Sequence, residues 1–303
     1  MTGGWPSVGV VLPTRDRPAQ LRAALAAVLG QEYPGEVRAV VVYDRSEPDQ
    51  SLAGDPRVRV VANTRTPGLA GARNTGILAL DTDLVAFCDD DDEWLAGKLR
   101  RQVLALRAVP AAEFASCGIV VAYRGRSTPR LAGCSQVRYA DLLRSRMMMV
   151  HSSTYLARRA ALTGGIGLLD EQIPGAQNED WDLALRAAWR RPIAHVDAPL
   201  VRVAWGEASY FSRQWESKAD GLRWMLERHP DIFGCRRGAA RVYGQIAFAQ
   251  ACLGRRADAC RWAGRALRKN WHERRVPFAV AVALGAVPGD TVLRVLHARG
   301  HGI

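Results

Sequence analysis

The first ninety residues alternate between short β-branched runs and longer amphipathic stretches, and few architectures accommodate that alternation. Four runs have the pattern of strands, at 8–12, 37–44, 58–63 and 84–90. Between them, apolar residues recur at helical spacing in 17–31 and 68–80. Strands that alternate with helices predict βαβ units and a largely parallel sheet. The sequence therefore indicates an α/β fold, in which right-handed crossovers bring the carboxyl ends of the strands to one edge.

Polar and charged residues collect directly after each of these strands. The four polar segments are 13–17, 43–49, 63–74 and 88–94. In open α/β sheets, ligands bind at the carboxyl ends of the strands. We therefore expect a ligand site at this edge of the sheet.

The segment after the fourth strand is an acidic run, Asp89 to Asp92 followed by Glu93, in a chain of formal net charge +12. Each like-charged neighbour raises the energy of the next, unless the cluster is solvated or holds a cation. A bound divalent metal is one interpretation. A helix-capping loop is the other, because aspartate is also favoured at N-caps and in first turns. These residues alone leave both interpretations open.

The positive charge would suit an anionic partner such as nucleic acid, phosphate or a membrane surface. Only three lysines contribute to it, and the arginines are scattered without a run of five or six. Arginine-rich codon usage explains such scatter equally well. We therefore expect no nucleic-acid partner.

The six cysteines include no C-x-x-C pair, which is typical of reduced thiols in the cytosol. The amino end lacks the basic and apolar segments of a signal peptide. The longest late apolar run, 276–287, is too short to cross a bilayer. We therefore expect a cytoplasmic protein that is at most peripheral to the inner face of a membrane.

The second half adds further strand patterns and then becomes helical. Strands are predicted at 114–123 and 192–205, a strand followed by a helix at 147–162, and an amphipathic helix after the glycine-rich turn that begins at 164. Two helices around Gly254 resemble a single tetratricopeptide unit. We predict an α/β domain at 1–230 and a C-terminal helical region at 231–303, whose helices are the candidate surface for a homodimer.

Several common phosphate-binding and catalytic motifs are absent from the sequence. There is no G-x-G-x-x-G after the first strand and no G-x-x-x-x-G-K-[ST], which argues against dinucleotide redox chemistry and P-loop nucleotide hydrolysis. The G-x-S-x-G elbow of α/β-hydrolases is also missing.

Taken in order, the polar segments resemble the family 2 glycosyltransferases with the GT-A fold, over residues 6–205. The matching motifs are P-T-x-x-R at Pro13, Thr14 and Arg17, an aspartate at Asp44, G-x-x-x-A-R-N-x-G from Gly68 to Gly76, D-x-D at Asp89 and Asp91 followed by Asp92 and Trp94, and Glu179-Asp180 after a glycine-rich turn. The resemblance implies a Rossmann-like, mostly parallel sheet flanked by helices. It also implies inverting transfer of a sugar from a nucleotide-diphosphate sugar with Mg²⁺ or Mn²⁺.

The resemblance further implies roles for individual residues. Those expected to bind the nucleotide are Pro13, Thr14, Arg17, Asp44, Arg73, Asn74, Asp89 and Asp90. Asp91 is the expected direct metal ligand, together with Asp89. Asp180 is the expected catalytic base, with Glu179 beside it near the acceptor or donor sugar. Trp94, His151 and Trp205 are candidates for the sugar or acceptor site, although His151 also fits a purely structural role.

Two features depart from the family pattern, and a third aspartate lies close to the expected base. The second strand ends Tyr43-Asp44-Arg45-Ser46, without the glycine that the family commonly has in this turn. The segment after the last strand contains Trp205 and no histidine, so no third metal ligand is apparent there. Asp182 follows Asp180 by two positions on a helix and points elsewhere, so we expect it to face solvent or to cap.

The acceptor cannot be inferred from the sequence. A small natural product, a lipid-linked glycan and a polysaccharide all remain open. UDP-sugar is the expected donor, with dTDP and GDP as alternatives. Two other functions also remain: a catalytically silent scaffold or basic nucleic-acid-binding protein on the same fold, and a sugar-nucleotide pyrophosphorylase. The pyrophosphorylase would need a glycine-rich loop after the first strand, which residues 13–20 lack.

Overall fold

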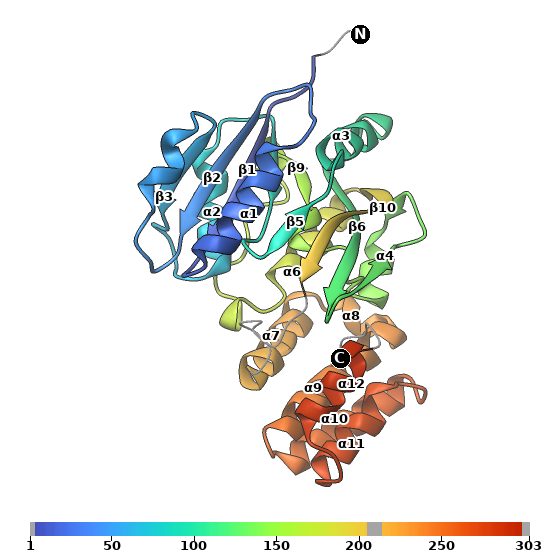
Figure 1. Ribbon diagram of the computed structural model, residues 1–303. Coiled ribbons are helices and arrows are strands. Elements are labelled where there is room, and N and C mark those ends of the chain that lie inside the picture. The colour runs from blue at the N-terminus through green and yellow to red at the C-terminus, as the bar shows by residue number, and fades with distance from the viewer. Residues whose placement is uncertain (1–3, 205–213, 299–303) are drawn as a thin grey trace.

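The computed structural model describes residues 4–204 and 214–298. A mixed sheet flanked by helices forms the upper part of the molecule in Figure 1, and a group of helices forms the lower part. The strands of the sheet follow the order β3-β2-β1-β4-β9-β6-β10-β5.

The first half of the chain forms the parallel part of the sheet. Its strands are β1 (Val8–Thr14), β2 (Val37–Tyr43), β3 (Val58–Ala62) and β4 (Leu84–Phe87). β1 pairs in parallel with both β2 and β4, and β2 pairs in parallel with β3. The predicted α/β fold is confirmed, and the polar segments after β1 and β4 meet at one edge.

The second half adds strands of mixed direction. They are β5 (Asp92–Trp94), β6 (Phe114–Tyr123), β7 (Arg126–Arg130), β8 (Gln136–Val137), β9 (Leu156–Arg158) and β10 (Ile193–Ala204). β9 runs antiparallel to both β4 and β6, whereas β10 runs parallel to β6. The strand predicted within 147–162 is thus only three residues long. Before it, the 3₁₀ turn Ser152–Thr154 diverts the chain, because Ser and Thr side chains bond to nearby backbone groups and compete with sheet pairing.

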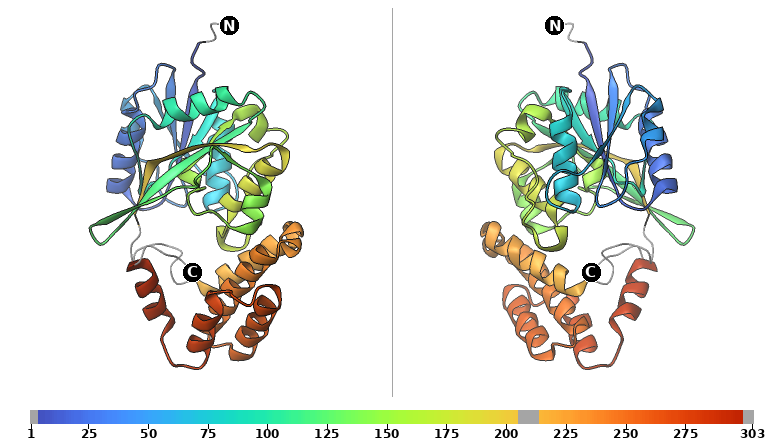
Figure 2. Two further views of the ribbon diagram at one scale, coloured as in Figure 1. Left: turned by 90° about the vertical axis from the view of Figure 1, so that its right-hand side faces the viewer. Right: turned by 90° about the vertical axis from the view of Figure 1, so that its left-hand side faces the viewer.

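Helices cover both faces of the sheet (Figures 1 and 2). One face packs against α1 (Pro18–Leu29) and α3 (Lys98–Ala108), and the other against α2 (Leu69–Ala79) and α6 (Glu179–Arg190). Val10 of β1 packs in the core under α1 and α3, and Val11 packs in the core under α2 and α6. Successive side chains of a strand point to opposite faces of the sheet. Short elements fill the connections: the 3₁₀ turns Gln50–Gly54 and Pro174–Ala176, and the helices α4 (Tyr139–Arg144) and α5 (Arg159–Leu162).

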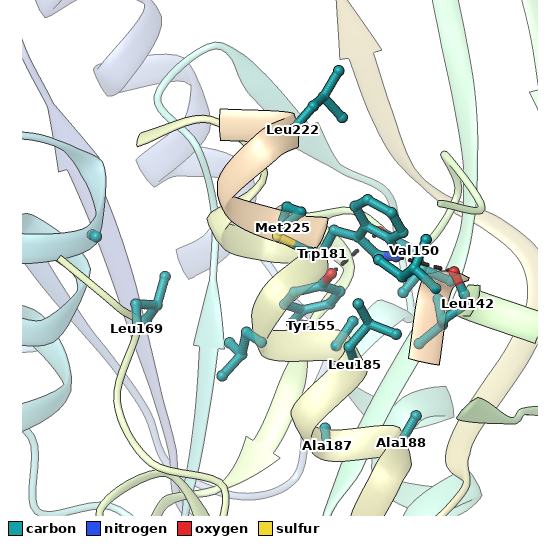
Figure 3. Packing of buried hydrophobic residues seen from close by; sticks show 14 of the residues in the cluster. Leu142, Val150, Tyr155, Leu169, Trp181, Leu185, Ala187, Ala188, Leu222 and Met225 are labelled. Atoms are coloured by element: carbon teal, nitrogen blue, oxygen red, sulfur yellow. Dashed lines mark hydrogen bonds between the residues drawn. The ribbon is translucent and has the colours of Figure 1, made fainter. Parts of the chain in front are cut away.

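Helix α6 carries three acids in its first turn, where the positive end of the helix dipole favours negative charge. Its Trp181 is buried, and the indole donates a hydrogen bond to the Leu142 carbonyl at 3.1 Å. Figure 3 shows Trp181 packed among Leu142, Tyr155 and Met225. This packing fixes the amino end of α6, which begins with Glu179 and Asp180.

Asp182 is not solvent-facing, contrary to the sequence-based expectation. It is fully buried and accepts hydrogen bonds from Arg186 at 2.9 Å and from His229 at 2.8 Å. A buried carboxylate is tolerated when it is paired and hydrogen-bonded. The sequence did not indicate this, because His229 is 47 residues away.

The C-terminal helices are α7 (Trp215–Arg228), α8 (Asp231–Gly234), α9 (Arg236–Cys252), α10 (Arg256–Lys269), α11 (Arg275–Ala283) and α12 (Gly289–Ala298). One hydrophobic cluster joins α6, α7 and α9. Helix α9 approaches α4 closely at Gly238, where a Cβ atom would lie 1.9 Å from the Leu143 carbonyl oxygen. The domain boundary near residue 230 stays a prediction, because buried side chains are continuous across it.

Among the residues that the structure describes, none of the helices combines the length and apolarity required to cross a membrane. The apolar run at 276–287 lies in the nine-residue helix α11 and in the turn that follows it.

Candidate active site

The loops after β1 and β4 are bonded to each other at the edge of the sheet. The Thr14 hydroxyl donates to Asp90 at 2.8 Å. Arg17 donates to Asp90 at 3.1 Å and to Asp91 at 2.8 Å. These contacts bring together groups more than seventy residues apart, as their positions at the ends of neighbouring parallel strands predict.

A group of possible metal ligands lies behind this contact. Asp89, Asp92 and His151 each offer one ligand atom, and these atoms all lie within 4.8 Å of one another. Asp92 is 5% exposed, and its Oδ2 has no hydrogen-bond partner among the described residues. Burial, with the negative charges of Asp89 and Asp91, raises the pKa of Asp92 well above its usual value. The ionised form of Asp92 is therefore unfavourable here, and a bound cation would stabilise it.

The donor set fits Mg²⁺ or Mn²⁺, because carboxylate oxygens are their preferred protein ligands and imidazole is acceptable to Mn²⁺. The cluster contains Asp92, whereas Asp91 is 37% exposed at its side chain and paired with Arg17. A ligand role for Asp91 therefore stays a prediction. Sequence signals for Asp92 and His151 do exist. Asp92 and Trp94 are two positions apart in a strand, so their side chains point to the same, buried face. His151 begins the polar turn that precedes β9.

Arg73 connects this cluster to the start of α6. It is 1% exposed and donates to Asp89 and to Glu179, each at 2.5 Å. Burial alone would raise the pKa of Asp89, but Arg73 and His151 lower it below its usual value. Burial raises the pKa of Glu179 to about 7 despite the attraction of Arg73. Arg73 therefore lies beneath the site, and its contact with a nucleotide stays a prediction.

Asn74 joins two loops that border the site. Its side chain exchanges two hydrogen bonds with the backbone of Leu169, both at 2.9 Å, and donates to Glu171 at 2.7 Å. Glu171 also accepts from Arg65 at 2.5 Å and from the Thr66 amide at 3.2 Å. Asn74 and Glu171 thus hold the loop after β3 against the segment that leads into α6.

Glu171→Gln should reduce the free energy of unfolding by about 1–3 kcal/mol near neutral pH, after allowance for solvent screening. Burial opposes ionisation of Glu171, but hydrogen bonds from Asn74, Arg65 and Thr66 lower its pKa from 4.5 to about 2. Its stabilisation is therefore present above pH 4.5 and lost as the pH falls toward 2. Urea unfolding at neutral and acidic pH measures this difference.

The matched control for this test is Glu93→Gln, because Glu93 is 56% exposed in a surface ion pair with Arg202. Surface pairs contribute little, so the control should change stability by less than about 1 kcal/mol. An equal loss for Glu171→Gln at both pH values would contradict the assignment.

Asp180 is 5% exposed at the amino end of α6. Arg146, from the loop after α4, donates to both of its carboxylate oxygens at 2.8 Å. Burial alone would raise the pKa of Asp180, but Arg146 and His151 lower it below its usual value. Asp180 is therefore ionised at neutral pH and able to accept a proton. Sequence reasoning missed Arg146, which lies 34 positions from Asp180 and outside the family motifs.

A second part of the site lies beyond the ends of β2 and β3. An open pocket of about 480 Å³ is lined by residues that include Tyr43, Asp44, Asn63 and Arg65. Asp44 accepts hydrogen bonds from the Asn63 side chain at 2.8 Å and from the Gly68 amide at 3.0 Å. Arg45 has φ 53°, the left-handed conformation for which glycine is the usual residue. The turn therefore has the left-handed backbone that glycine favours, although arginine occupies the position. Asp44 lines the pocket.

Trp94 lies close to the acidic loop but offers no open ring face to a sugar. It is 3% exposed, its indole donates to the Ser153 carbonyl at 3.0 Å, and the Lys98 ammonium lies 3.7 Å from the ring centre. Its inward position on β5 explains the difference from the sequence-based expectation. Pro13 is buried within β1. Trp205 lies outside the described residues.

Comparison with known proteins identifies the family. The family described as "Glycosyl transferase family 2" matches residues 9–163, just over half of the chain. The chain therefore belongs to the family 2 glycosyltransferases. The relatives described next match too little of their own length to transfer their specificity.

Two curated relatives illustrate the similarity. The chain is 30% identical over 99 residues to the Escherichia coli enzyme named UDP-Glc:alpha-D-GlcNAc-diphosphoundecaprenol beta-1,3-glucosyltransferase WfgD, covering 32% of this chain and 39% of that protein. It is 30% identical over 183 residues to an N-acetylglucosaminyltransferase of Mesorhizobium japonicum, covering 55% and 42%. The chain thus spans about two fifths of the length of these relatives.

Two solved structures illustrate the similarity in fold. The first is S. aureus TarS 1–349 in complex with UDP-GlcNAc, with TM-score 0.61, 16% identity and coverage of 97% of this chain and 92% of that one. The second is the mannosyltransferase PcManGT of Pyrobaculum calidifontis in complex with GDP-Man and Mn²⁺, with TM-score 0.56, 18% identity and coverage of 93% and 90%. These similarities establish the GT-A fold.

Proposed function

We propose that the protein is a metal-dependent inverting glycosyltransferase that moves a hexosyl group from a UDP-sugar to an acceptor hydroxyl. One observation carries the proposal: Arg73 connects the Asp89–Asp92–His151 cluster to Glu179, the residue next to Asp180. It combines a candidate cation site with an ionised carboxylate that could serve as a base.

Asp89, Asp92 and His151 would hold the cation, with Asp91 at the exposed edge of the same loop. A hard divalent cation there would neutralise the charge that develops on the diphosphate as the glycosidic bond breaks. Arg73 and Arg17 hold the acidic loop in place through different residues, Asp89 and Asp91. This preorganised loop would bind the donor without rearranging.

Asp180 would accept the proton of the acceptor hydroxyl. General-base assistance of this kind contributes about 10²- to 10⁴-fold. Arg146 occupies both oxygens of Asp180 in this structure, so the acceptor would have to displace at least one of these hydrogen bonds. Direct attack of the activated hydroxyl on the anomeric carbon would invert its configuration.

The donor assignment rests on the pocket at the ends of β2 and β3. Asp44 would face the base of the nucleoside, and Thr14, Arg17 and Asp90 would border its ribose and phosphates. Nucleotide-sugars in the complexes of the two fold neighbours support a nucleotide-sugar donor. UDP is our expectation, and GDP is the alternative that the second neighbour keeps open.

The acceptor, cellular location and oligomeric state complete the proposal. The name of the E. coli relative describes a lipid-linked acceptor, which supports a peripheral role at the inner face of a membrane. Dimerisation through the C-terminal helices stays a prediction; Trp271 and Leu284, both more than 70% exposed, support it.

A donor panel tests the proposed reaction. Incubation of the full chain with Mn²⁺ and UDP-, dTDP- or GDP-hexoses should release nucleoside diphosphate fastest from a UDP-sugar. Proton NMR of the transfer product from an α-linked donor should show a β-linkage. A catalytically silent scaffold would release no nucleoside diphosphate, and an α-linked product would contradict inversion.

A further inference from the structure

Three arginines from separate parts of the chain lie around the amino end of α6 and the adjoining part of α9. Arg146 pairs with Asp180, and Arg241 of α9 places its guanidinium 4.9 Å from the ring centre of Trp181, the next residue of α6. Arg275 begins α11 and lies against α9, where its Cβ is 3.1 Å from the position that a Cβ atom would take at Gly244, about one turn after Arg241. The C-terminal helices therefore contribute positive charge directly to the edge of the active site.

Two of these three arginines form an ion pair with a carboxylate. Arg146 is paired with Asp180, and Arg275 is paired with Glu273 at 2.8 Å. Within 4–204 and 214–298, no carboxylate forms an ion pair with Arg241, whose Nη1 donates only a long 3.5 Å hydrogen bond to the Gln245 amide. Arg241 thus has no ion-pair partner among the described residues, unlike Arg146 and Arg275.

Arg241 is also short of hydrogen-bond partners. The residue is 9% exposed, and its buried Nε and Nη2 find no acceptor among the described residues, nor does Nε of Arg275. Buried polar groups are nearly always hydrogen-bonded, so such orphans call for an explanation such as a missing ion. Burial, together with Arg275 and Arg146, lowers the pKa of Arg241 to about 9. An anion at this place would accept hydrogen bonds from the unpaired nitrogens. It would also stabilise the charged form of Arg241.

We propose that Arg241, with Arg146 and Arg275, binds a phosphate group of the acceptor substrate. This inference rests on the proposed function, in which Asp180 is the base. A guanidinium presents a planar set of donors that matches phosphate oxygens in pairs. The side chains of Arg146 and Arg275 are 41% and 26% exposed, so the group is open to solvent on their side.

The arrangement also links acceptor binding to the base. A phosphate bound by Arg146 would compete with Asp180 for the same guanidinium. Withdrawal of Arg146 would free a carboxylate oxygen for the acceptor hydroxyl. The phosphate of the correct acceptor would therefore help to release the base that acts on it.

Calorimetric titration of phenyl phosphate into the full chain, saturated with UDP and Mn²⁺, tests this site. The wild type should bind phenyl phosphate but not phenol, and Arg241→Gln should weaken binding about tenfold or more, because a charged hydrogen-bonded pair is lost. Arg241→Lys should retain part of the affinity. The matched control is Arg237→Gln, which removes the same charge from an exposed position on α9 and should leave binding unchanged.

Several outcomes would overturn the proposal. Equal binding by wild type and Arg241→Gln would show that the arginine group does not hold the anion. Loss of phenyl phosphate binding when UDP and Mn²⁺ are added would assign the arginines to the donor diphosphate instead. If Arg241→Gln does not fold, Arg241→Lys and Arg275→Gln carry the comparison. Failure to bind UDP and Mn²⁺ would refute the proposed function separately, since phenyl phosphate can also be titrated without them.

Discussion

Asp180→Asn should lower the turnover number by about 10²- to 10⁴-fold and leave the affinity for donor nearly unchanged. The substitution keeps the shape of the side chain and an oxygen for Arg146 but removes its ability to accept a proton. Asp180 contacts Arg146 and the backbone of α6, whereas the acidic loop is held by other residues. Initial rates of UDP release and calorimetric titration of donor measure the two effects.

The control for this variant is Asp220→Asn on α7. Asp220 is 44% exposed and pairs with Arg223 on the surface, so its isosteric change should leave turnover unaffected. Asp180→Glu should recover only part of the activity, because the longer side chain keeps the charge but moves the oxygen. Full turnover by Asp180→Asn would remove Asp180 from the mechanism.

Asp92→Asn should weaken Mn²⁺-dependent UDP binding by about 100-fold or more, since a buried anionic ligand would be lost from the cluster. The same change should stabilise the protein in the absence of metal, because Asp92 is a buried carboxylate placed beside Asp89. Calorimetry with UDP and Mn²⁺, and thermal unfolding without metal, measure these opposite effects.

Asp91→Asn is the matched comparison. Asp91 is partly exposed and paired with Arg17, outside the cluster of ligand atoms, so its substitution should weaken binding by only about threefold. If Asp91→Asn abolishes binding and Asp92→Asn does not, the ligand role expected from the family motif is correct and the geometric assignment to Asp92 is wrong.

The first half of the fold could be predicted because its information is local. β-branched runs and helical spacing within 8–90 identify the strands and helices, and chain handedness then gathers their carboxyl ends. The contacts of Thr14 and Arg17 with the acidic loop follow from that topology. The short antiparallel β9 could not be predicted in this way, because its pairing with β4 and β6 depends on tertiary contacts and not on its own three residues.

The electrostatic connections of the site were also beyond local patterns. Arg73 meets Glu179 across 106 positions, and Arg146 meets Asp180 across 34. Arg241 reaches the site from a helix whose sequence suggested only packing. Each of these contacts joins residues that are distant in sequence, so residue type and spacing do not indicate the partner, even for Arg73, which lies in a family motif.

The central claim is that the acidic loop holds a divalent cation together with a nucleoside diphosphate. Anomalous scattering from crystals grown with Mn²⁺ and UDP tests it most directly. The account predicts a manganese peak in contact with Asp89, Asp92 and His151, with UDP extending toward Asp44. The absence of manganese from this cluster while UDP is bound, or a manganese peak elsewhere in the molecule, would contradict it.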